Sequence, residues 1–216
     1  MRLSPLSAGA VSAAVLAGVS VWVFAQLPGL WVWAAFIGWA SYDQSGADRR
    51  AFFTSSTCMV FGVVMAWLVA LVVVAGVIPL SGLATSALAS AIASFIIVWV
   101  SRLAPFSNVP AAFYGFASAF AFLLLSAGAF SVGAMTSPTL GNVLVCTPVS
   151  LLIGSSLGVL HQCLATALTA PDQHPRDSSA AGLTALAEAR SCAPYPGAER
   201  LWRHPKSGDE GFDGSA

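Results

Sequence analysis

The chain has 216 residues, of which 57% are hydrophobic and only 8% are charged. Soluble domains carry about 25% charged residues, so this composition excludes a soluble enzyme, a nucleic-acid-binding protein, which needs a basic face, and a secreted disulfide scaffold. Between positions 3 and 170 the charged side chains are Asp43, Asp48, Arg49, Arg50 and Arg102. The chain is therefore expected to be a polytopic membrane protein with a polar tail.

Six apolar segments are expected to cross the membrane. A spanning helix needs about 20 apolar residues to cross a hydrocarbon core of about 30 Å. Backbone polar groups in lipid must be satisfied within the segment, so each span is predicted to be an α-helix. Prolines and glycines between the segments mark the connections. In chain order the predicted spans are 8–27, 30–42, 57–78, 83–101, 109–129 and 140–160, of which the second is short.

The few basic residues predict the orientation of these spans. With the N-terminus in the cytoplasm, the arginines at positions 2, 49, 50 and 102 and the basic residues of the tail all lie on the cytoplasmic side. The loops on the other side carry no charge, as the positive-inside rule requires. A cleaved signal peptide is the alternative for positions 1–26, because an arginine, an apolar run and a Val23-Phe24-Ala25 site occur there.

The chain contains an internal repeat. Segment 11–41 aligns with segment 88–118 without gaps, and twelve positions are identical. Because the repeat unit contains three spans, the second unit is expected to enter the membrane from the opposite side. The sequence therefore predicts two inverted three-helix repeats, about 8–80 and 83–168, in a membrane domain of residues 1–170. The most informative identical pairs are Trp22/Trp99, Pro28/Pro105, Phe36/Phe113 and Gly38/Gly115.

The second and fifth spans carry the same motif, Ala-Ala-Phe-x-Gly-x-Ala-Ser. Transporters with inverted repeats hold their solute near the midplane, where short or interrupted spans of the two halves meet. In the motif, glycine allows close backbone approach, phenylalanine supplies a constriction, and a hydroxyl donates and accepts hydrogen bonds. The alternative is that these small residues serve ordinary helix packing. The candidate pore or solute-lining residues are Phe36, Gly38, Ser41, Tyr42, Phe113, Gly115 and Ser118.

Four short motifs also occur in a fixed order along the spans. They are Trp33-Ala34-x-Phe36-x-Gly38-x-x-x-Tyr42, Gly62-Val63-Val64-x-Ala66, Val109-Pro110-x-x-Phe113-x-Gly115-x-Ala117-x-x-Phe120-Ala121 and Ser150-Leu151-x-x-Gly154-x-x-x-Gly158. In these motifs, over residues 6–169, the chain resembles the YcdZ-type bacterial inner-membrane proteins, a family of unknown function. The resemblance implies a small multi-pass protein of a bacterial inner membrane and supplies no substrate or catalytic residue. Members tend to have a Gly-Gly pair after the second span, where this chain has Ser45-Gly46.

The spans lack the ionisable side chains that mark proton relays in membranes. His161, near the inner end of the sixth span, is a candidate gate because a histidine changes charge near neutral pH. The alternative is a histidine that lies at the interface or has its hydrogen bonds satisfied. No nucleophile–base pair, nucleotide-binding loop or metal-ligand spacing stands out in the sequence. The protein is therefore not expected to be an enzyme or to bind a cofactor or a metal.

Small residues also predict contacts between helices and between copies of the chain. Gly154 and Gly158 form a GxxxG face, which is typical of helix packing in membranes. Further stripes of small residues favour a homo-oligomer. After Pro171 the composition changes sharply, and residues 171–216 are predicted to form a disordered cytoplasmic tail.

Together these observations favour a channel or facilitator for a small, mostly uncharged solute of the size of urea or ammonia. Two alternatives stay open. One is a secondary transporter that is coupled without buried carboxylates. The other is a non-transporting membrane protein that assembles with a partner through its small-residue helix faces and its tail.

Overall fold

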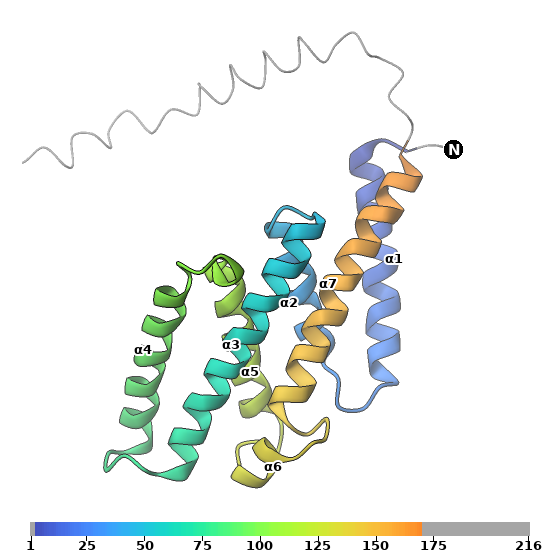
Figure 1. The fold of residues 1–216 in the computed structure, drawn as a ribbon. Coiled ribbons are helices and arrows are strands. Elements are labelled where there is room, and N and C mark those ends of the chain that lie inside the picture. Colours follow the sequence, from blue (N-terminus) through green and yellow to red (C-terminus); the bar gives the residue numbers. More distant parts are fainter. Residues whose placement is uncertain (1–2, 170–216) are drawn as a thin grey trace, which may run out of the picture. The chain divides into compact units, whose positions relative to one another are not determined.

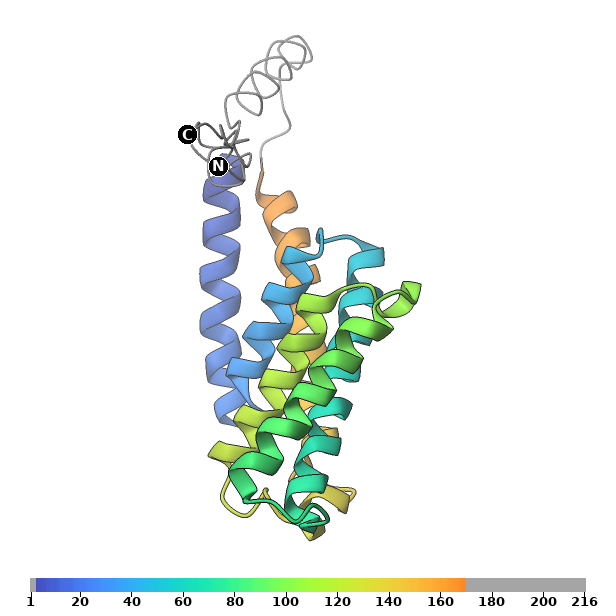
Figure 2. The same ribbon diagram turned by 90° about the vertical axis from the view of Figure 1, so that its left-hand side faces the viewer.

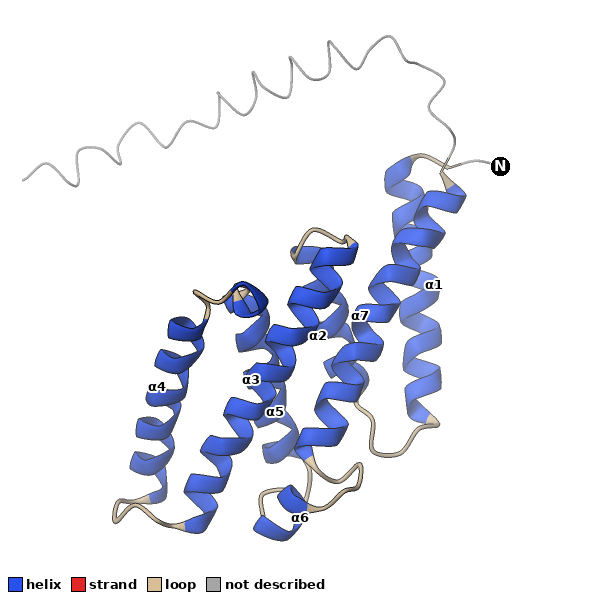
Figure 3. Ribbon diagram, in the orientation of Figure 1, coloured by secondary structure: helices blue, strands red, loops and turns tan. Residues whose placement is uncertain are grey.

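The computed structural model describes residues 3–169 and contains helices and loops but no strand over that range (Figures 1 and 3). The predicted all-α fold is confirmed for this part of the chain, whereas the predicted tail, residues 171–216, lies outside the described residues. In chain order the elements are α1 (Pro5–Ala25), α2 (Val32–Gln44), α3 (Arg49–Ala75), α4 (Gly82–Val100), the 3₁₀ helix η1 (Ala104–Phe106), α5 (Val109–Leu125), α6 (Val132–Thr136) and α7 (Val143–Leu168).

Six of the helices alternate in direction along the chain. α1, α3 and α5 run one way, α2, α4 and α7 run the other way, and α6 lies in the connection before α7 (Figures 1 and 2). The described chain therefore begins and ends at the same end of the helices. There the backbone N–H of Leu3 donates to the carbonyl oxygen of Leu168 at 3.1 Å.

The two ends of the helices differ in charge. One end holds the start of α1, the α2–α3 and α4–α5 connections and the end of α7, and it carries the arginines at positions 49, 50 and 102; we call it the arginine end (Figure 1). The other end is formed by the loops 26–31, 76–81 and 126–142. These loops contain no charged residue, and we call this the uncharged end.

Four helices, α1, α3, α4 and α7, are long and apolar enough to cross a membrane. The protein is thus a multi-pass membrane protein with four long candidate spans. α2 has 13 residues and α5 has 17. At 1.5 Å per residue these lengths correspond to about 20 Å and about 25 Å, which is less than the hydrocarbon core of about 30 Å. The two spans that carry the repeated motif are therefore the short ones.

Three predicted spans have different boundaries in the structure. α3 begins at Arg49, before the predicted start at position 57, and α7 ends at Leu168, beyond the predicted end at position 160. α5 ends at Leu125, before the predicted end at position 129, because the backbone of Ser126 is extended. Hydropathy marks only the apolar part of a helix, whereas capping can extend it into polar residues. In α3 the Asp48 side chain accepts a hydrogen bond from the backbone N–H of Ala51 and so caps the charged first turn.

The Asp48 cap leads to a stability prediction. The Asp48→Ala substitution should lower the free energy of unfolding by about 1 kcal/mol, because a backbone N–H at the start of α3 loses its acceptor. The measurement is thermal unfolding of the purified protein in detergent. Asp48→Asn is the matched control, since its side-chain oxygen can still cap the helix. An equal loss in the Asn variant would contradict the cap and would attribute the effect to the charge.

The two most extensive helix pairs join helices that are not neighbours in the sequence. α2 packs along α7 and α3 packs along α5, while α1 lies on α7 and α4 lies on α3 (Figure 1). α3 and α7 also touch each other, as do α2 and α5. Each of the two long central helices therefore packs against a short helix that carries the repeated motif.

The outer faces of α1 and α4 are strongly apolar. In α1 the buried positions are Ala8, Ser12, Leu16, Ser20 and Phe24, one every fourth residue. The rest of the helix exposes large apolar side chains, among them Trp22 at 69% exposure, and in α4 Phe95 and Trp99 are exposed in the same way. A surface of this kind suits the hydrocarbon of a lipid bilayer, in agreement with membrane insertion.

Candidate functional site

Two helix crossings at the centre of the molecule are made by glycines. Gly38 of α2 lies so close to α7 that a Cβ atom would overlap the carbonyl oxygen of Leu151, and a Cβ on Gly154 of α7 would overlap the carbonyl oxygen of Ala35. Such backbone-to-backbone contact is possible only without a side chain. The α2–α7 crossing therefore depends on glycine in both helices.

The α3–α5 crossing has the same construction. A Cβ atom on Gly115 of α5 would overlap the carbonyl oxygen of Met59, and one on Gly62 of α3 would overlap the carbonyl oxygen of Ala112. Gly38 and Gly115, which are candidate pore residues by sequence, thus lie in helix-packing contacts. Gly158, one turn after Gly154, packs against the rings of Tyr42 and Trp39.

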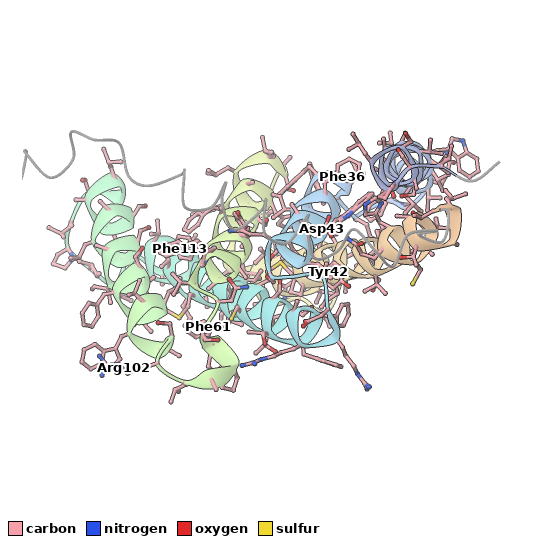
Figure 4. All side chains as sticks on the ribbon, turned by 90° about the horizontal axis from the view of Figure 1, so that it is seen from above. Phe36, Tyr42, Asp43, Phe61, Arg102 and Phe113 are labelled. Carbon is pink, nitrogen blue, oxygen red and sulfur yellow. The ribbon has the colours of Figure 1, made fainter. Side chains whose placement is uncertain are left out.

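The two phenylalanines of the repeated motif lie apart. Phe36 is half-buried beside α1, and Phe113 is half-buried toward α4 (Figure 4). The Phe36 ring centroid is 6.5 Å from that of Trp39, and the Phe113 ring centroid is 6.5 Å from that of Phe116. Each ring therefore packs with an aromatic neighbour on its own helix, and the structure does not bring the two rings together.

Ser41 and Tyr42 make hydrogen bonds at the arginine end of α2. The hydroxyl of Ser41 is hydrogen-bonded to that of Ser55 at 2.6 Å, and both residues are buried. The hydroxyl of Tyr42 donates to the carbonyl oxygen of Ala47 at 2.7 Å, within the turn that joins α2 to α3. Ala47 has a positive φ of 54°, which is unfavourable for alanine. The tyrosine bond helps to stabilise this turn.

Ser118, at the matching position of the motif in α5, differs from Ser41. Its side chain is fully buried, and its hydroxyl has no hydrogen-bond partner. Thr147 of α7 is 1% exposed and its hydroxyl likewise has no partner. Buried hydroxyls without a partner are unusual, because each costs about 1–3 kcal/mol of lost hydration.

His161, the candidate gate, lies between α7 and α1. Its Nδ1 is 2.8 Å from the hydroxyl of Ser12, and its ring centroid is 5.2 Å from that of Trp39. The next residue, Gln162, donates to the carboxylate of Asp43 at 3.4 Å. The imidazole is thus a half-buried side chain with a hydrogen-bond partner, and it joins three helices near the arginine end.

A cavity of about 810 Å³ opens at the uncharged end. It lies between the α1–α2 loop and the segment from the end of α5 to the start of α7, and its walls are mostly apolar. Trp31 and Phe122 stand in its wall with their ring centroids 6.1 Å apart. The hydroxyl of Ser126, another lining residue, is buried without a partner.

A smaller pocket of about 420 Å³ lies at the arginine end. Its lining is polar and includes Asp48, Arg50, Ser45 and Asn108. The side-chain amide of Asn108 donates to the hydroxyl of Ser45 at 2.7 Å. The structure therefore has a hollow at each end, an apolar one and a polar one.

Several residues of these hollows are absent from the sequence prediction. In the alignment of segment 11–41 with segment 88–118, Trp31 stands opposite the non-identical Asn108, and Ser45 and Phe122 lie beyond the aligned segments, so a search for identical residues passes over all four. Among residues 3–169 no group of three or more His, Cys, Asp or Glu side chains could hold a metal ion.

Comparison with known protein families gives a match. The family model described as "Protein of unknown function (DUF1097)" matches residues 10–166, which is most of the chain. The chain belongs to the DUF1097 family. The match covers α1 to α7 almost completely. Neither the search of curated proteins nor the search of solved structures gives a significant match.

Proposed function

We propose that this DUF1097 protein is a channel or facilitator for a small, mostly uncharged solute of the size of urea or ammonia. Its helices form two inverted three-helix repeats, α1–α2–α3 and α4–α5–α7. The solute passes between the two halves from the cavity at the uncharged end to the pocket at the arginine end. The observation that carries the proposal is that these two hollows lie at opposite ends and are lined by corresponding residues of the two halves.

The burial pattern of the first helices supports the repeat. In α4 the buried residues are Thr85, Ala89, Ala93 and Ile97. The alignment of segment 11–41 with segment 88–118, extended to both whole helices, places each of them opposite a buried residue of α1. The same alignment places the start of α4 opposite the start of α1, and the start of α5 opposite that of α2. α4 also runs in the opposite direction to α1 (Figure 1). The same alignment therefore matches the identical residues, the starts of the helices and the buried faces of α1 and α4.

The glycine crossings extend the correspondence to the third helices. In the register of the repeat, Ala35 and Gly38 of α2 correspond to Ala112 and Gly115 of α5. Because Gly154 meets Ala35 as Gly62 meets Ala112, α7 corresponds to α3 with Gly154 opposite Gly62. The α2–α7 and α3–α5 pairs are then equivalent crossings, as expected for two halves that exchange their third helices.

The hollows at the two ends follow the same correspondence. In the register of the repeat, Trp31 lies opposite Asn108 and Ser45 lies opposite Phe122. The aromatic contact of Trp31 with Phe122 at one end is thus equivalent to the hydrogen bond of Asn108 with Ser45 at the other. Inverted repeats give a transport pathway equivalent contacts at its two ends. Here one of these contacts is apolar and the other is polar.

The charges support an orientation with the arginine end in the cytoplasm of a bacterial inner membrane. Arg102 follows α4 at this end, and its guanidinium carbon is 3.5 Å from the centroid of the Trp99 ring (Figure 4). Arginine and tryptophan in contact at a helix end are typical of the membrane interface. The likeness of the sequence to YcdZ-type inner-membrane proteins supports the same location.

The test of the proposal is solute permeability of the purified protein in liposomes, measured by stopped-flow light scattering. We expect faster passage of urea- or ammonia-sized neutral solutes than in protein-free liposomes, without saturation and without an ion gradient. Unchanged permeability across a panel of small neutral solutes would contradict a channel. Saturable uptake that requires an ion gradient would favour the secondary transporter, and a stoichiometric co-purifying partner without permeability would favour the assembly protein.

The stripes of small residues support a homo-oligomer as the working state. Ala87 and Ala91 are exposed on α4, and much of α1 is exposed as well. The proposed activity is passive passage, so no catalytic residue, cofactor or metal is assigned to it.

A further inference from the structure

The correspondence of the two halves pairs four buried hydroxyl residues. Ser41 of α2 corresponds to Ser118 of α5 in the register of the repeat, and Ser55 of α3 corresponds to Thr147 of α7 when Gly62 is set opposite Gly154. All four are buried at 0–1% exposure. In the first half the two hydroxyls bond each other at 2.6 Å. The α5–α7 contact of the second half is therefore the place where the equivalent pair is expected.

The second pair does not make the bond that the first pair makes. The hydroxyls of Ser118 and Thr147 both lack a hydrogen-bond partner. Each hydroxyl can donate one hydrogen bond and accept two. Leaving both hydroxyls without a hydrogen-bond partner in an apolar interior would cost about 1–3 kcal/mol for each of them. Of the two equivalent pairs, this one alone has hydroxyls that are free to bind a third group.

A proline adds a backbone acceptor at the same point of α7. Pro148 follows Thr147 directly and has no N–H, so the carbonyl oxygen of Leu144 loses the donor that a regular α-helix would supply. In α3 the corresponding residue is Ser56, which keeps its N–H. A freed backbone carbonyl in a membrane helix needs another partner.

Ser118 and Thr147 do not line the cavity at the uncharged end, but each lies close in sequence to a residue that lines it or contacts its lining. Phe122, in the cavity wall, is four residues after Ser118 on α5, so the two side chains share a helix face. On α7, Cys146 precedes Thr147, and its thiol donates to the carbonyl oxygen of Gly29, which also lines the cavity, at 2.6 Å.

We propose that the hydroxyls of Ser118 and Thr147, together with the carbonyl oxygen of Leu144, bind one small neutral molecule that both donates and accepts hydrogen bonds. Water occupies the site at rest, and a passing solute of similar chemistry replaces it. The site rests on the proposed function and deepens it, because it names a place within the second half, between α5 and α7, where the solute is held.

The test is a double-mutant cycle on the protein in detergent, with the buffer's own water as the probe. The variants are Ser118→Ala, the isosteric Thr147→Val, and both together, and the readout is the midpoint of thermal unfolding. If one water joins the two hydroxyls, each single substitution lowers the midpoint and the double substitution lowers it little further, since the water is lost in either case. Ser41→Ala, Ser55→Ala and their combination form the positive control. Their hydroxyls bond each other directly, so these two substitutions are also expected to be non-additive.

An empty site gives the opposite result. Thr147→Val would then raise the midpoint, because it removes a buried hydroxyl that has no partner. Either that rise or additive effects of the two substitutions would overturn the proposal. The double-mutant cycle needs no transport measurement, so its outcome is independent of the proposed function. A wild-type protein without permeability would contradict the channel. The additivity or non-additivity of the two substitutions would still show whether the site binds water. In a permeable protein, Thr147→Val is expected to slow solute passage by about tenfold, the equivalent of about one hydrogen bond.

Discussion

The Gly154→Ala variant is expected to lose about 3 kcal/mol of stability, which is large for the addition of one methyl group. The new Cβ atom would overlap the carbonyl oxygen of Ala35 on the facing helix. Because the obstacle is backbone, no side-chain rotation can relieve the overlap, and α2 must move away from α7. Overpacking of this kind costs about 1–3 kcal/mol in ordinary cores and more where the backbone is fixed. Gly62→Ala should have the same effect at the equivalent crossing.

Thermal unfolding in detergent checks this prediction, with Gly18→Ala as the matched control. Gly18 lies inside α1 and a Cβ atom there meets nothing within 4 Å. The control should raise the midpoint slightly, since alanine favours a helix by up to about 1 kcal/mol over glycine. For a chain of this size a loss of about 3 kcal/mol corresponds to roughly 10 °C. A Gly154→Ala protein as stable as the Gly18→Ala protein would contradict the close crossing.

Chemical labelling should show that cysteines at the two ends of the helices react from opposite sides of the membrane. A cysteine at Gly133, at the uncharged end, is expected to react with a membrane-impermeant maleimide in intact bacterial cells whose outer membrane has been permeabilised. A cysteine at Ser107, at the arginine end, is expected to react only after the inner membrane is opened. The physical reason is the positive-inside rule, by which the end that carries the arginines at positions 49, 50 and 102 is expected to lie in the cytoplasm.

The labelling experiment needs a background without reactive cysteines. Cys58 and Cys146 are buried and can stay, whereas Cys163 is exposed and must be replaced; Cys192 is replaced with it. Labelling of both positions from the same side would contradict a membrane crossing by α5, which separates them. Labelling of Ser107→Cys alone in intact cells would contradict the proposed orientation.

Much of the helical order could be predicted from the sequence because the membrane imposes it. Apolar runs bounded by proline and glycine predict the starts of α2, α4 and α5 close to the observed Val32, Gly82 and Val109. The limits of α3 and α7 could not be predicted in this way. Their ends contain charged and polar residues, and only the capping by Asp48 and the packing on α1 show that these residues are helical.

The repeat was detectable only where identical side chains are required. At the crossings, alanine and glycine are needed in both halves because the backbones touch, so Ala35 and Gly38 recur as Ala112 and Gly115. In the proposed repeat, the third helices α3 and α7 correspond although their side chains differ, and α6 with its loops shifts their register relative to that of the first two helices. Sequence comparison at a single offset therefore could not align α3 with α7.

The candidate site was harder to predict than the fold. Recurrence singled out Gly38 and Gly115, but close packing of backbones also explains it. The hollows at the two ends are lined by pairs that differ between the halves, Trp31 with Phe122 and Asn108 with Ser45. If the proposed path needs different chemistry at its two ends, the corresponding residues there are not identical, and a search for identical residues does not detect them.

Solute permeability of an obstructed variant tests the pathway between the halves most directly. Ala127 is exposed in the lining of the cavity at the uncharged end, so Ala127→Trp fills part of the entrance. Leu124→Trp is the matched control, because Leu124 is 75% exposed on α5 and is not a lining residue. In liposomes containing equal amounts of protein, we predict that Ala127→Trp reduces passage of the neutral solute by at least tenfold while Leu124→Trp retains it. Equal passage through both variants would contradict a pathway that begins at this cavity.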